Sequence, residues 1–569
     1  MAETLVSPGV LARENDQSFI TQQPVQVGAA IVGPTVKGPV EIPTIVTSYS
    51  DYQNRFGTTF ESGSDTYTYL TSIAAYNYFQ NGGNTLLVAR VVTGSWDYAS
   101  ASIGGQETPT TSSLTIETLY QGASFNNTSS LLSGSALDSG SANNIRWEIA
   151  SSDTANGTFS LVVRQGNDNQ DSKSVLETWT NLSLDPNQSN YVAAVIGDQK
   201  LSYNSTGNYI AVSGSYANAS RYIRVASVDR PTPNYFDNAG IAKAQYTSSI
   251  PSVGSGSYGG SFSGGSGVNQ GQNMYENIST TTQGLTAGCY DNMLDLLSNA
   301  DDYRFNILLL PGLLNSTHTS QITTAISNAQ SRGDNMVVVD PVAYSVDSNT
   351  TVLTEASSRN TSYAAMYWPW LQTIDPDLGK QVWVPASTMM GGVFAFNDNA
   401  GEPWFAPAGI NRGGMSTVIR TKKRLTQSDR DTLYQGNINP IAQFPGTGVV
   451  VYGQKTLQKQ ASALDRVNVR RLLISLKSYI SQVALNLVFE QNTAATRNNF
   501  LAQVNPYLES VQQRQGLYAF KVVMDDSNNT PDVIDRNQLV GAIYLQPTKT
   551  AEFIYLDFNI LPTGATFPA

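Results

Sequence analysis

The sequence predicts a multidomain α/β (α+β) chain. Its mixed-sheet core is built from the N-terminal and C-terminal parts of the chain, with β-rich outer domains inserted between them and an extended arm at each end. Apolar runs of strand length alternate with helical patterns in residues 29–94 and again after residue 288, which is typical of an α/β layer. Between them, short strand-like pieces are separated by Ser, Thr, Asn and Gly clusters. With 569 residues, 40% of them hydrophobic, the chain has room for about four domains.

The N-terminal part is predicted to be an extended arm, residues 1–28, that leads into a first core portion, residues 29–94. The run GAAIVGPTVKGPV from residue 28 places a short apolar stretch between Gly-Pro pairs, which predicts a buried strand. A helix is expected over residues 67–80, where apolar side chains recur every three or four positions and NGG follows as a stop signal. The run TLLVARVV, residues 85–92, is expected to be a fully buried strand.

The inserted segment, residues 95–288, is predicted to form one or two β-rich domains, because few of its stretches suit a helix longer than two turns. Within it, residues 254–267 comprise seven Gly and five Ser out of fourteen. Such a composition favours a flexible loop or linker over a packed element. We expect this segment to mark a boundary or an exposed tip.

The α/β pattern returns in residues 289–440. Helices expected at residues 290–299 and 322–333 alternate with buried strands expected at residues 305–312 and 335–341. Alternating elements of this size predict βαβ units with a largely parallel sheet.

Residues 441–550 are predicted to form a C-terminal core domain with a long amphipathic helix from about Asp465, a candidate N-cap, to Glu490. A second helical stretch, residues 493–513, is expected to break near Asn505, because Pro506 disfavours helix before it. The remaining residues, 551–569, are predicted to be a C-terminal arm that contains a strand of alternating pattern at residues 551–561.

The residues that carry most metal and nucleophile chemistry are scarce, since the chain has one Cys and one His. Zinc sites need several such ligands, and a disulfide needs two thiols. We interpret His318 as a surface-loop histidine, and the acidic pairs as solvated turns because none follows the spaced calcium-loop pattern. These pairs are Asp301/Asp302, Asp375/Asp377 and Asp525/Asp526.

Two glycine-containing segments approach nucleotide-binding motifs without meeting them. In GVVVYGQKT, residues 448–456, Gln454 stands where a phosphate-binding loop has its lysine, and VVVY is strand-like. GSGSYG, from residue 254, lies in low-complexity sequence with no preceding strand or following helix. The sequence therefore predicts no enzyme, no cofactor and no metal ion.

The charge is acidic overall, with 33 basic and 44 acidic residues and a net charge of −11. This balance argues against general attraction to nucleic acid or anionic lipid. No stretch approaches the ~18 apolar residues that span a bilayer, and MAETLVSPGV lacks the basic flank and apolar core of a secretion signal. We therefore expect no membrane insertion and a chain made and kept in a cytoplasm unless something releases it.

One segment departs from this balance: residues 411–480 hold twelve basic and three acidic residues, a local surplus of nine positive charges. One interpretation of this surplus is that the basic residues form structural ion pairs and a solvated helix face. Nucleic-acid binding fits poorly, because VIRTKKRLT has neither interleaved aromatic residues nor a groove-reading motif. A negatively charged protein partner fits better.

A series of distinctive sequence blocks covers about the first 95 residues and residues 290–567. The blocks are SPGV from residue 7, AAIVGPTVKGPVEIPTIVTSYSDYQNRFG from 29, VWVPAS from 382, EPWFAPAGINRG from 402, RDTLYQGNINPI from 430, GVVVYGQKTL from 448, DRVNVRRLLISLK from 465, FEQNT from 489 and NNTPDVIDRNQLVGAIYLQPTKTAEFI from 528. In this order they resemble the tail sheath proteins of contractile-tailed bacteriophages, while the middle of the chain matches only that family's habit of inserting variable outer domains.

The resemblance implies a structural subunit that polymerises as stacked six-membered rings around a tail tube and contracts without nucleotide, driving the tube through the host envelope. Implied partners are copies of itself, the tail tube protein, the baseplate and the tail-terminator or neck proteins. The implied location is the virion, after assembly in the host cytoplasm. Terminal arms of the family add strands to sheets of neighbouring subunits, which suits both predicted arms.

Two sets of residues follow as hypotheses. We expect the basic helix to face an acidic tube through weak surface ion pairs; its residues are Arg466, Arg470, Arg471 and Lys477. We expect the arms to exchange strands between subunits through the apolar residues Val6, Val10, Phe19, Ile20, Phe553, Tyr555, Phe558 and Ile560.

Three alternatives stay open. A sheath of a related contractile injection or secretion system is nearest, although secretion-system sheaths are usually split between two chains. The Ser/Thr/Asn-rich middle would suit a glycan-binding virion adhesin. Paired carboxylates would suit a polysaccharide hydrolase.

Overall fold

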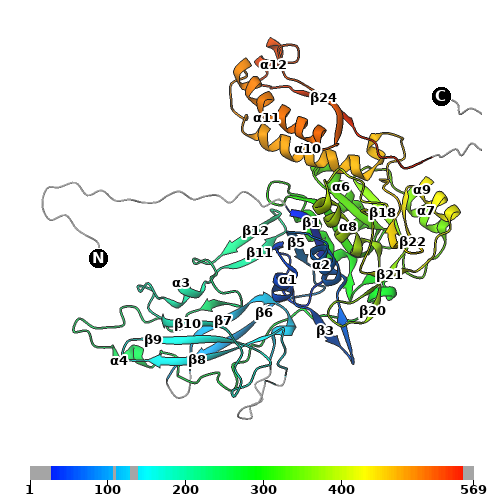
Figure 1. Cartoon of the computed structure of the whole chain (residues 1–569). Helices are drawn as coiled ribbons and strands as arrows, with labels where there is room; N and C mark the ends of the chain where they lie inside the picture. The colour runs from blue at the N-terminus through cyan, green and yellow to red at the C-terminus, as the bar shows by residue number, and fades with distance from the viewer. Residues whose placement is uncertain (1–26, 107–110, 128–136, 138, 555–569) are drawn as a thin grey trace, which may run out of the picture.

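A mixed eight-stranded sheet lies at the centre of the chain (Figure 1), in the order β2–β5–β1–β16–β17–β18–β22–β23. In this computed structural model, residues 27–106, 111–127, 137 and 139–554 are described. The six middle strands run parallel, and β2 and β23 add antiparallel edges. The strands are β1 (Val27–Gly33), β2 (Thr44–Val46), β5 (Leu86–Arg90), β16 (Phe305–Leu314), β17 (Met336–Asp340), β18 (Ala364–Trp368), β22 (Ile438–Phe444) and β23 (Gly448–Val451).

Helices cover both faces of this sheet, as the alternation of side chains along β1 shows. Ala29 and Ile31 belong to one buried cluster with residues of α1, α2 and α8, while Ala30 and Val32 belong to a second with residues of α5, α6, α7 and α9. The predicted α/β core is confirmed, with one apolar core on each face. The helices are α1 (Tyr49–Phe56), α2 (Leu70–Gln80), α5 (Asp291–Leu296), α6 (Thr319–Arg332), α7 (Asn349–Ser357), α8 (Ala386–Ala400) and α9 (Gln427–Gln435).

The predicted elements of the core are largely confirmed. The helix expected over residues 67–80 begins at Leu70, because residues 65–68 form β4 (Asp65–Thr68), which pairs with β3 (Thr59–Ser62). Gly333 ends α6 in the left-handed conformation, at φ 73°, which a glycine adopts without steric cost.

The segment inserted between β5 and α5 is β-rich, as predicted, and its sheets enclose one buried cluster. In Figure 1 it extends away from the central sheet. Three-stranded sheets β10–β9–β8 and β13–β7–β6 supply most of the cluster, and the hairpin β11–β12 stands apart from them. The elements are β6 (Tyr98–Gly104), β7 (Ser112–Gln121), η1 (Ala123–Phe125), β8 (Ile145–Asp153), β9 (Thr158–Gln165), β10 (Val175–Ser183), α3 (Val192–Ile196), β11 (Lys200–Asn204), β12 (Tyr209–Ser213), β13 (Ile223–Ser227) and α4 (Ala244–Thr247).

The interpretation of residues 254–267 as a flexible linker was wrong. Ser263 and Ser266 form bridges with β6 and with the residue before it, and Phe262 is fully buried in the inserted domain. Gly260 shows why glycine is needed, because a Cβ there would lie 1.9 Å from the carbonyl oxygen of Trp147. The glycines allow close backbone approach rather than mobility.

Smaller elements complete the α/β core. Strands β19, β20 and β21 form a three-stranded antiparallel sheet, and β14 pairs with β15. Their bounds are η2 (Tyr275–Asn277), β14 (Thr281–Thr282), β15 (Leu285–Thr286), η3 (Ala287–Tyr290), β19 (Leu371–Ile374), β20 (Gln381–Val384), β21 (Val418–Thr421) and η4 (Ala463–Asp465).

A C-terminal unit of two long helices and a β-hairpin lies beyond the central sheet (Figure 1). Its first helix begins one residue later than predicted, because Asp465 lies in η4 and Arg466, not Asp465, is the N-cap residue. The predicted break near Asn505 was wrong, because the second helix continues through Pro506 with Phe500, Val504, Leu508 and Val511 buried. The elements are α10 (Val467–Leu485), α11 (Ala494–Gln513), β24 (Leu517–Val523), α12 (Pro531–Asp535) and β25 (Ala542–Pro547).

Among the described residues, none of the helices has both the length and the apolar character needed to span a bilayer.

Candidate assembly site

The hairpin formed by β24 and β25, here called the C-terminal hairpin, is fixed by the helices beneath it. Its inner side chains share a buried cluster with Leu472 and Leu476 of α10 and with Val504 and Leu508 of α11. Phe520 pairs with Leu545 across the two strands, and Val522 pairs with Ile543. These residues alternate with more exposed ones, which is why one face of the hairpin lies on the helices and the other faces outward.

The two strands of the C-terminal hairpin form a sheet of their own, without a third strand among the described residues. Its outer surface carries Tyr518 and Tyr544, each 62% exposed. A two-stranded sheet is marginal by itself and presents main-chain N–H and C=O groups along its outer edges. Chemically, this arrangement can accept a further strand through main-chain hydrogen bonds.

Most residues predicted to exchange strands lie outside the described part of the chain. This holds for Val6, Val10, Phe19 and Ile20 in the N-terminal arm and for Tyr555, Phe558 and Ile560 in the C-terminal arm. Phe553 is described; it is 68% exposed and belongs to neither a helix nor a strand. The strand-exchange prediction therefore stays a prediction.

Two of the four basic residues predicted to face a tube are buried in the chain itself. Arg470 is 4% exposed, donates to the Ser362 hydroxyl, and lies 4.0 Å from the ring centroid of Tyr363. Arg471 is 3% exposed and forms an ion pair with Asp398 at 2.5 Å. Burial lowers the pKa of Arg470 from its usual value. The expectation of surface ion pairs is corrected for these two arginines.

The other two basic residues are more accessible. Lys477 is exposed on α10, with Nζ 3.4 Å from the Tyr363 hydroxyl. Arg466 is half-buried and holds Glu552 with two hydrogen bonds, at 2.7 and 3.0 Å. A tube-facing role for α10 stays a prediction, which Lys477 suits best by its exposure.

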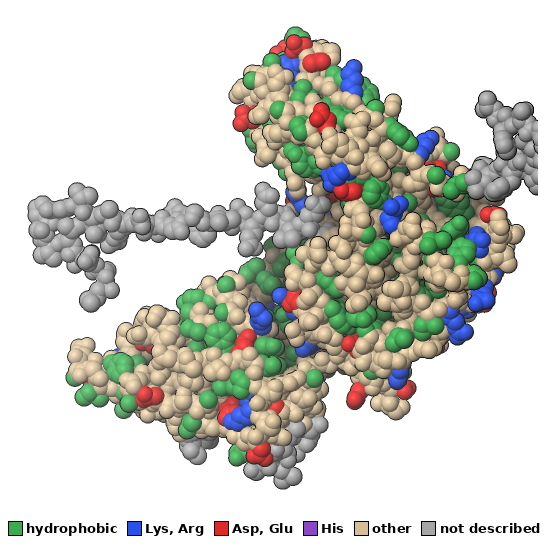
Figure 2. Space-filling model, viewed as in Figure 1, with side chains coloured by type: hydrophobic (Ala, Val, Ile, Leu, Met, Phe, Trp, Pro, Cys, Tyr) green, Lys and Arg blue, Asp and Glu red, His purple; other side chains and the backbone are tan. Residues whose placement is uncertain are grey.

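The basic surplus of residues 411–480 reaches the surface mainly away from α10. Arg420 and Arg424 are exposed in and after β21, and Lys459 is exposed beyond β23. Figure 2 shows Lys and Arg side chains gathered along the edge of the core beside α7, α9 and β21. An acidic partner would meet this edge more readily than the buried face of α10.

Two polar groups predicted to be solvated are buried. His318 is 2% exposed, and its Nδ1 accepts a hydrogen bond from the Leu314 amide at 2.9 Å. Asp375 is fully buried and accepts from the amides of Asp377 and Leu378, which makes it part of the β19–β20 turn. No group of three or more His, Cys, Asp or Glu side chains in the described ranges is arranged to hold a metal ion.

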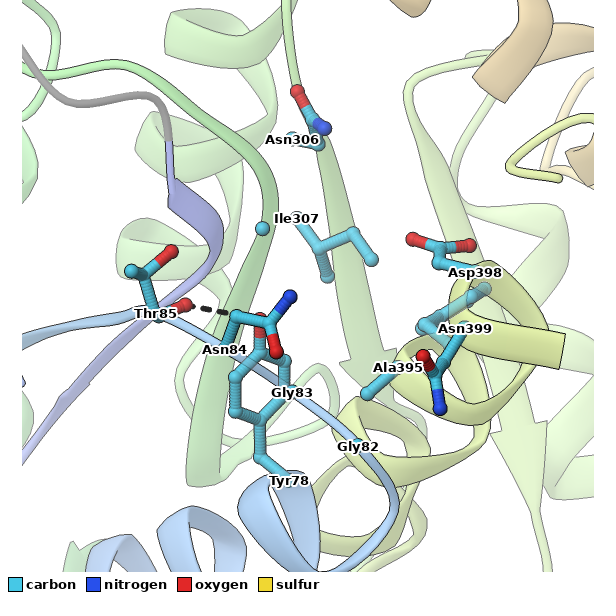
Figure 3. Close-up of a pocket in the computed structure, with 12 residues that line it drawn as sticks. Tyr78, Gly82, Gly83, Asn84, Thr85, Asn306, Ile307, Ala395, Asp398 and Asn399 are labelled. Atoms are coloured by element: carbon cyan, nitrogen blue, oxygen red, sulfur yellow. Dashed lines mark hydrogen bonds between the residues drawn. The ribbon is translucent and has the colours of Figure 1, made fainter. Parts of the chain in front are cut away.

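A cavity of about 350 Å³, lined by both polar and apolar residues, lies between the ends of α2 and α8, beside the start of β1 (Figure 3). The Tyr78 hydroxyl donates to the Thr85 carbonyl oxygen at 2.9 Å on one side. On the other side stand Asp398 and Asn399 of α8, and the Asp398 charge is already paired with Arg471. Neither Asp398 nor Glu552 was recognisable from the sequence as part of a site, because each pairs with an arginine more than 70 residues away.

Together, the fold and the hairpin define a structural subunit with an α/β core, an inserted β domain and a sheet that can accept a strand. Residues 289–457 match the phage tail sheath protein central domain, and residues 459–561 match the phage tail sheath C-terminal domain. Residues 289–561 are therefore similar to the consecutive central and C-terminal domains of phage tail sheath proteins.

Individual relatives agree with this assignment. The chain is 42% identical to the tail sheath protein of Vibrio phage KVP40 over 208 residues, which are 37% of this chain and 31% of that protein. It is 38% identical to the tail sheath protein of Enterobacteria phage T4 over 238 residues, which are 41% and 36% of the two chains. The match thus spans about a third of the length of these curated relatives.

The fold is similar to the crystal structure of a sheath tail protein from Listeria innocua, with a TM-score of 0.51. The alignment covers 92% of this chain and 96% of that one at 9% sequence identity. This likeness concerns the fold.

Proposed function

We propose that the chain is a structural subunit of the contractile sheath around a phage tail tube. The observation that carries the proposal is the match of residues 289–457 and 459–561 to the two consecutive sheath domains. The C-terminal hairpin supports it, because a two-stranded sheet with open edges offers a neighbouring copy a place to add a strand. In this proposal the chain is not an enzyme and uses no cofactor.

Assembly follows from head-to-tail contacts. Contacts of this kind that do not close in a plane generate helical tubes, and stacked six-membered rings are one such arrangement. Arms that join neighbouring sheets through main-chain bonds hold subunits together while their domains rotate. The extended sheath is then a kinetically trapped state, and its contraction drives the tube through the host envelope.

The proposed partners are copies of the chain, the tail tube protein, the baseplate and the tail-terminator or neck proteins. The proposed location is the phage tail of the virion, after assembly in the host cytoplasm. For the tube contact, we propose Lys477 on α10, since it is the exposed residue among the four basic candidates that are described.

Negative-stain electron microscopy of the purified full-length chain tests the proposal. We expect tubes or hexameric rings for the wild type. Deletion of residues 1–26 or of residues 555–569 should leave soluble subunits that no longer polymerise. The matched control is Asp532→Ala, which removes an exposed ion pair with Arg536 at 2.7 Å and should polymerise like the wild type. A wild-type chain that stays monomeric at every concentration would overturn the proposal.

A further inference from the structure

The last described residues of the chain return from the C-terminal hairpin to the α/β core. Beyond β25, the Thr548 amide donates to the Gly516 carbonyl oxygen at 3.2 Å, within the C-terminal unit. Four residues later, Glu552 contacts α9, the segment after β23 and the start of α10. In Figure 1 the chain passes beside α9 at this point. The segment therefore links two parts of the subunit.

Three side chains hold the Glu552 carboxylate. Arg466 donates from Nε to Oε1 at 2.7 Å and from Nη2 to Oε2 at 3.0 Å. The Tyr434 hydroxyl donates to Oε2 at 2.8 Å, and Gln454 Nε2 donates to Oε1 at 3.0 Å. Gln454 also donates to the Thr550 hydroxyl at 2.6 Å. A bidentate guanidinium with two further donors is a strong and geometrically specific way to bind a carboxylate.

The three donors are positioned by the backbone of the core rather than by Glu552. The Val467 amide donates to the Gln454 carbonyl oxygen at 2.8 Å, so the segments that carry Gln454 and Arg466 are bound to each other. Tyr434 comes from the last turn of α9. The site is therefore preorganised, and it loses little conformational freedom when a carboxylate enters.

The electrostatics agree with this geometry. Burial raises the pKa of the Glu552 carboxyl, but hydrogen bonds from Arg466, Gln454 and Tyr434 outweigh it, and the pKa lies below its ordinary value. Glu552 is 18% exposed at its side chain and Gln454 is 3% exposed. The carboxylate is thus bound in its charged form in a largely dry site.

We propose that Tyr434, Gln454 and Arg466 form a carboxylate-binding site that anchors the chain's own C-terminal tail at Glu552. The anchor sets the point from which the tail continues toward a neighbouring subunit. These residues are positioning residues for strand exchange, and this consequence rests on the proposed function. The anchoring itself does not, because every contact lies within one chain.

Limited trypsin digestion of the unassembled full-length chain tests the anchor, since Lys549 is exposed and lies between Thr548 and Glu552. In the variants Glu552→Ala and Arg466→Ala, we expect cleavage after Lys549 to be faster by about tenfold or more, because cleavage follows local release of the segment. Asp532→Ala, which removes an exposed ion pair, should be cleaved at the wild-type rate.

The charge-swapped variant Arg466→Glu/Glu552→Arg distinguishes the loss of this ion pair from a general loss of folded structure. It should recover part of the protection, because Tyr434 and Gln454 can donate to a carboxylate or accept from a guanidinium. Equal cleavage in the wild type and in both single variants would overturn the anchor.

Electron microscopy then separates the anchor from the proposed function. We expect Glu552→Ala to form fewer or less regular tubes than the wild type, and the charge swap to recover part of the difference. If Glu552→Ala releases the tail but polymerises like the wild type, the positioning role is wrong. If the wild type forms no tubes, the proposed function fails, while the trypsin result still decides the anchor.

Discussion

Arg471→Ala is expected to lower the free energy of unfolding by about 2–3 kcal/mol. Arg471 is 3% exposed, lies 2.5 Å from Asp398 and places its guanidinium 4.9 Å from the ring centroid of Phe394. Removing one partner of a fully buried pair costs about 3–5 kcal/mol. The Asp398 side chain is 31% exposed and regains water when the arginine is lost, so the cost falls below that range.

Urea denaturation of the unassembled chain, followed by circular dichroism, measures this loss. Lys477→Ala is the matched control, since it removes a basic side chain that is exposed on the same helix; its change should stay within about 0.5 kcal/mol. An Arg471→Ala variant that unfolds at the wild-type urea midpoint but no longer assembles around tubes would refute a buried structural role for Arg471. That outcome would support the tube-facing role that the sequence predicted for Arg471.

Three other changes test the packing of each part of the chain. Arg164→Ala should destabilise the inserted domain by about 2–3 kcal/mol, less than the loss of a sole partner, because Asp168 and Glu148 lose the buried guanidinium that binds each at 2.8 Å but keep ion pairs with Arg146 and Lys173; thermal unfolding of the whole chain should show an earlier transition, and an unchanged profile contradicts this. Burial raises the pKa of Asp340 to about 7, so the stability that its protonated form contributes is complete below pH ~4 and is lost as the pH rises through 7. The urea midpoint of Asp340→Asn, which does not titrate, should therefore rise relative to that of the wild type between pH 5 and pH 8. A difference between the two midpoints that stays constant with pH would refute the pKa shift. Pro506→Ala should stabilise α11 by roughly 1–2 kcal/mol by restoring a main-chain hydrogen bond; a lower melting temperature would show that the proline fits its site.

The central sheet was predictable because its strands are buried on both faces. Residues 85–92, 305–312 and 335–341 read as continuous apolar runs, and each became a parallel strand. The inserted domain was also predictable, because its short strand-like pieces between Ser, Thr, Asn and Gly clusters differ from the helix–strand alternation of the core on both sides. Strand order was not predictable, since β1 pairs with β5 and β16, which stand on either side of some 200 inserted residues in the chain.

Local rules failed where tertiary packing opposed them. Pro506 stays helical because Val504 and Leu508 on either side of it are buried against α10. Gly256 and Gly260 suggested mobility by composition, but they are needed where the backbone meets Trp147. In both places the deciding contact comes from a distant segment, which a local pattern does not contain.

The arginines at the start of α10 likewise have partners that a local sequence pattern does not contain. Residue type established that Arg466, Arg470 and Arg471 would bind acceptors, but not which ones. They bind Glu552, Ser362 and Asp398, at 86, 108 and 73 residues from their own positions. Since these contacts lie inside the subunit, the clustering of arginines at the start of α10 reflects the joining of the C-terminal unit, the tail and the core. A partner meets only the charges that this joining leaves exposed.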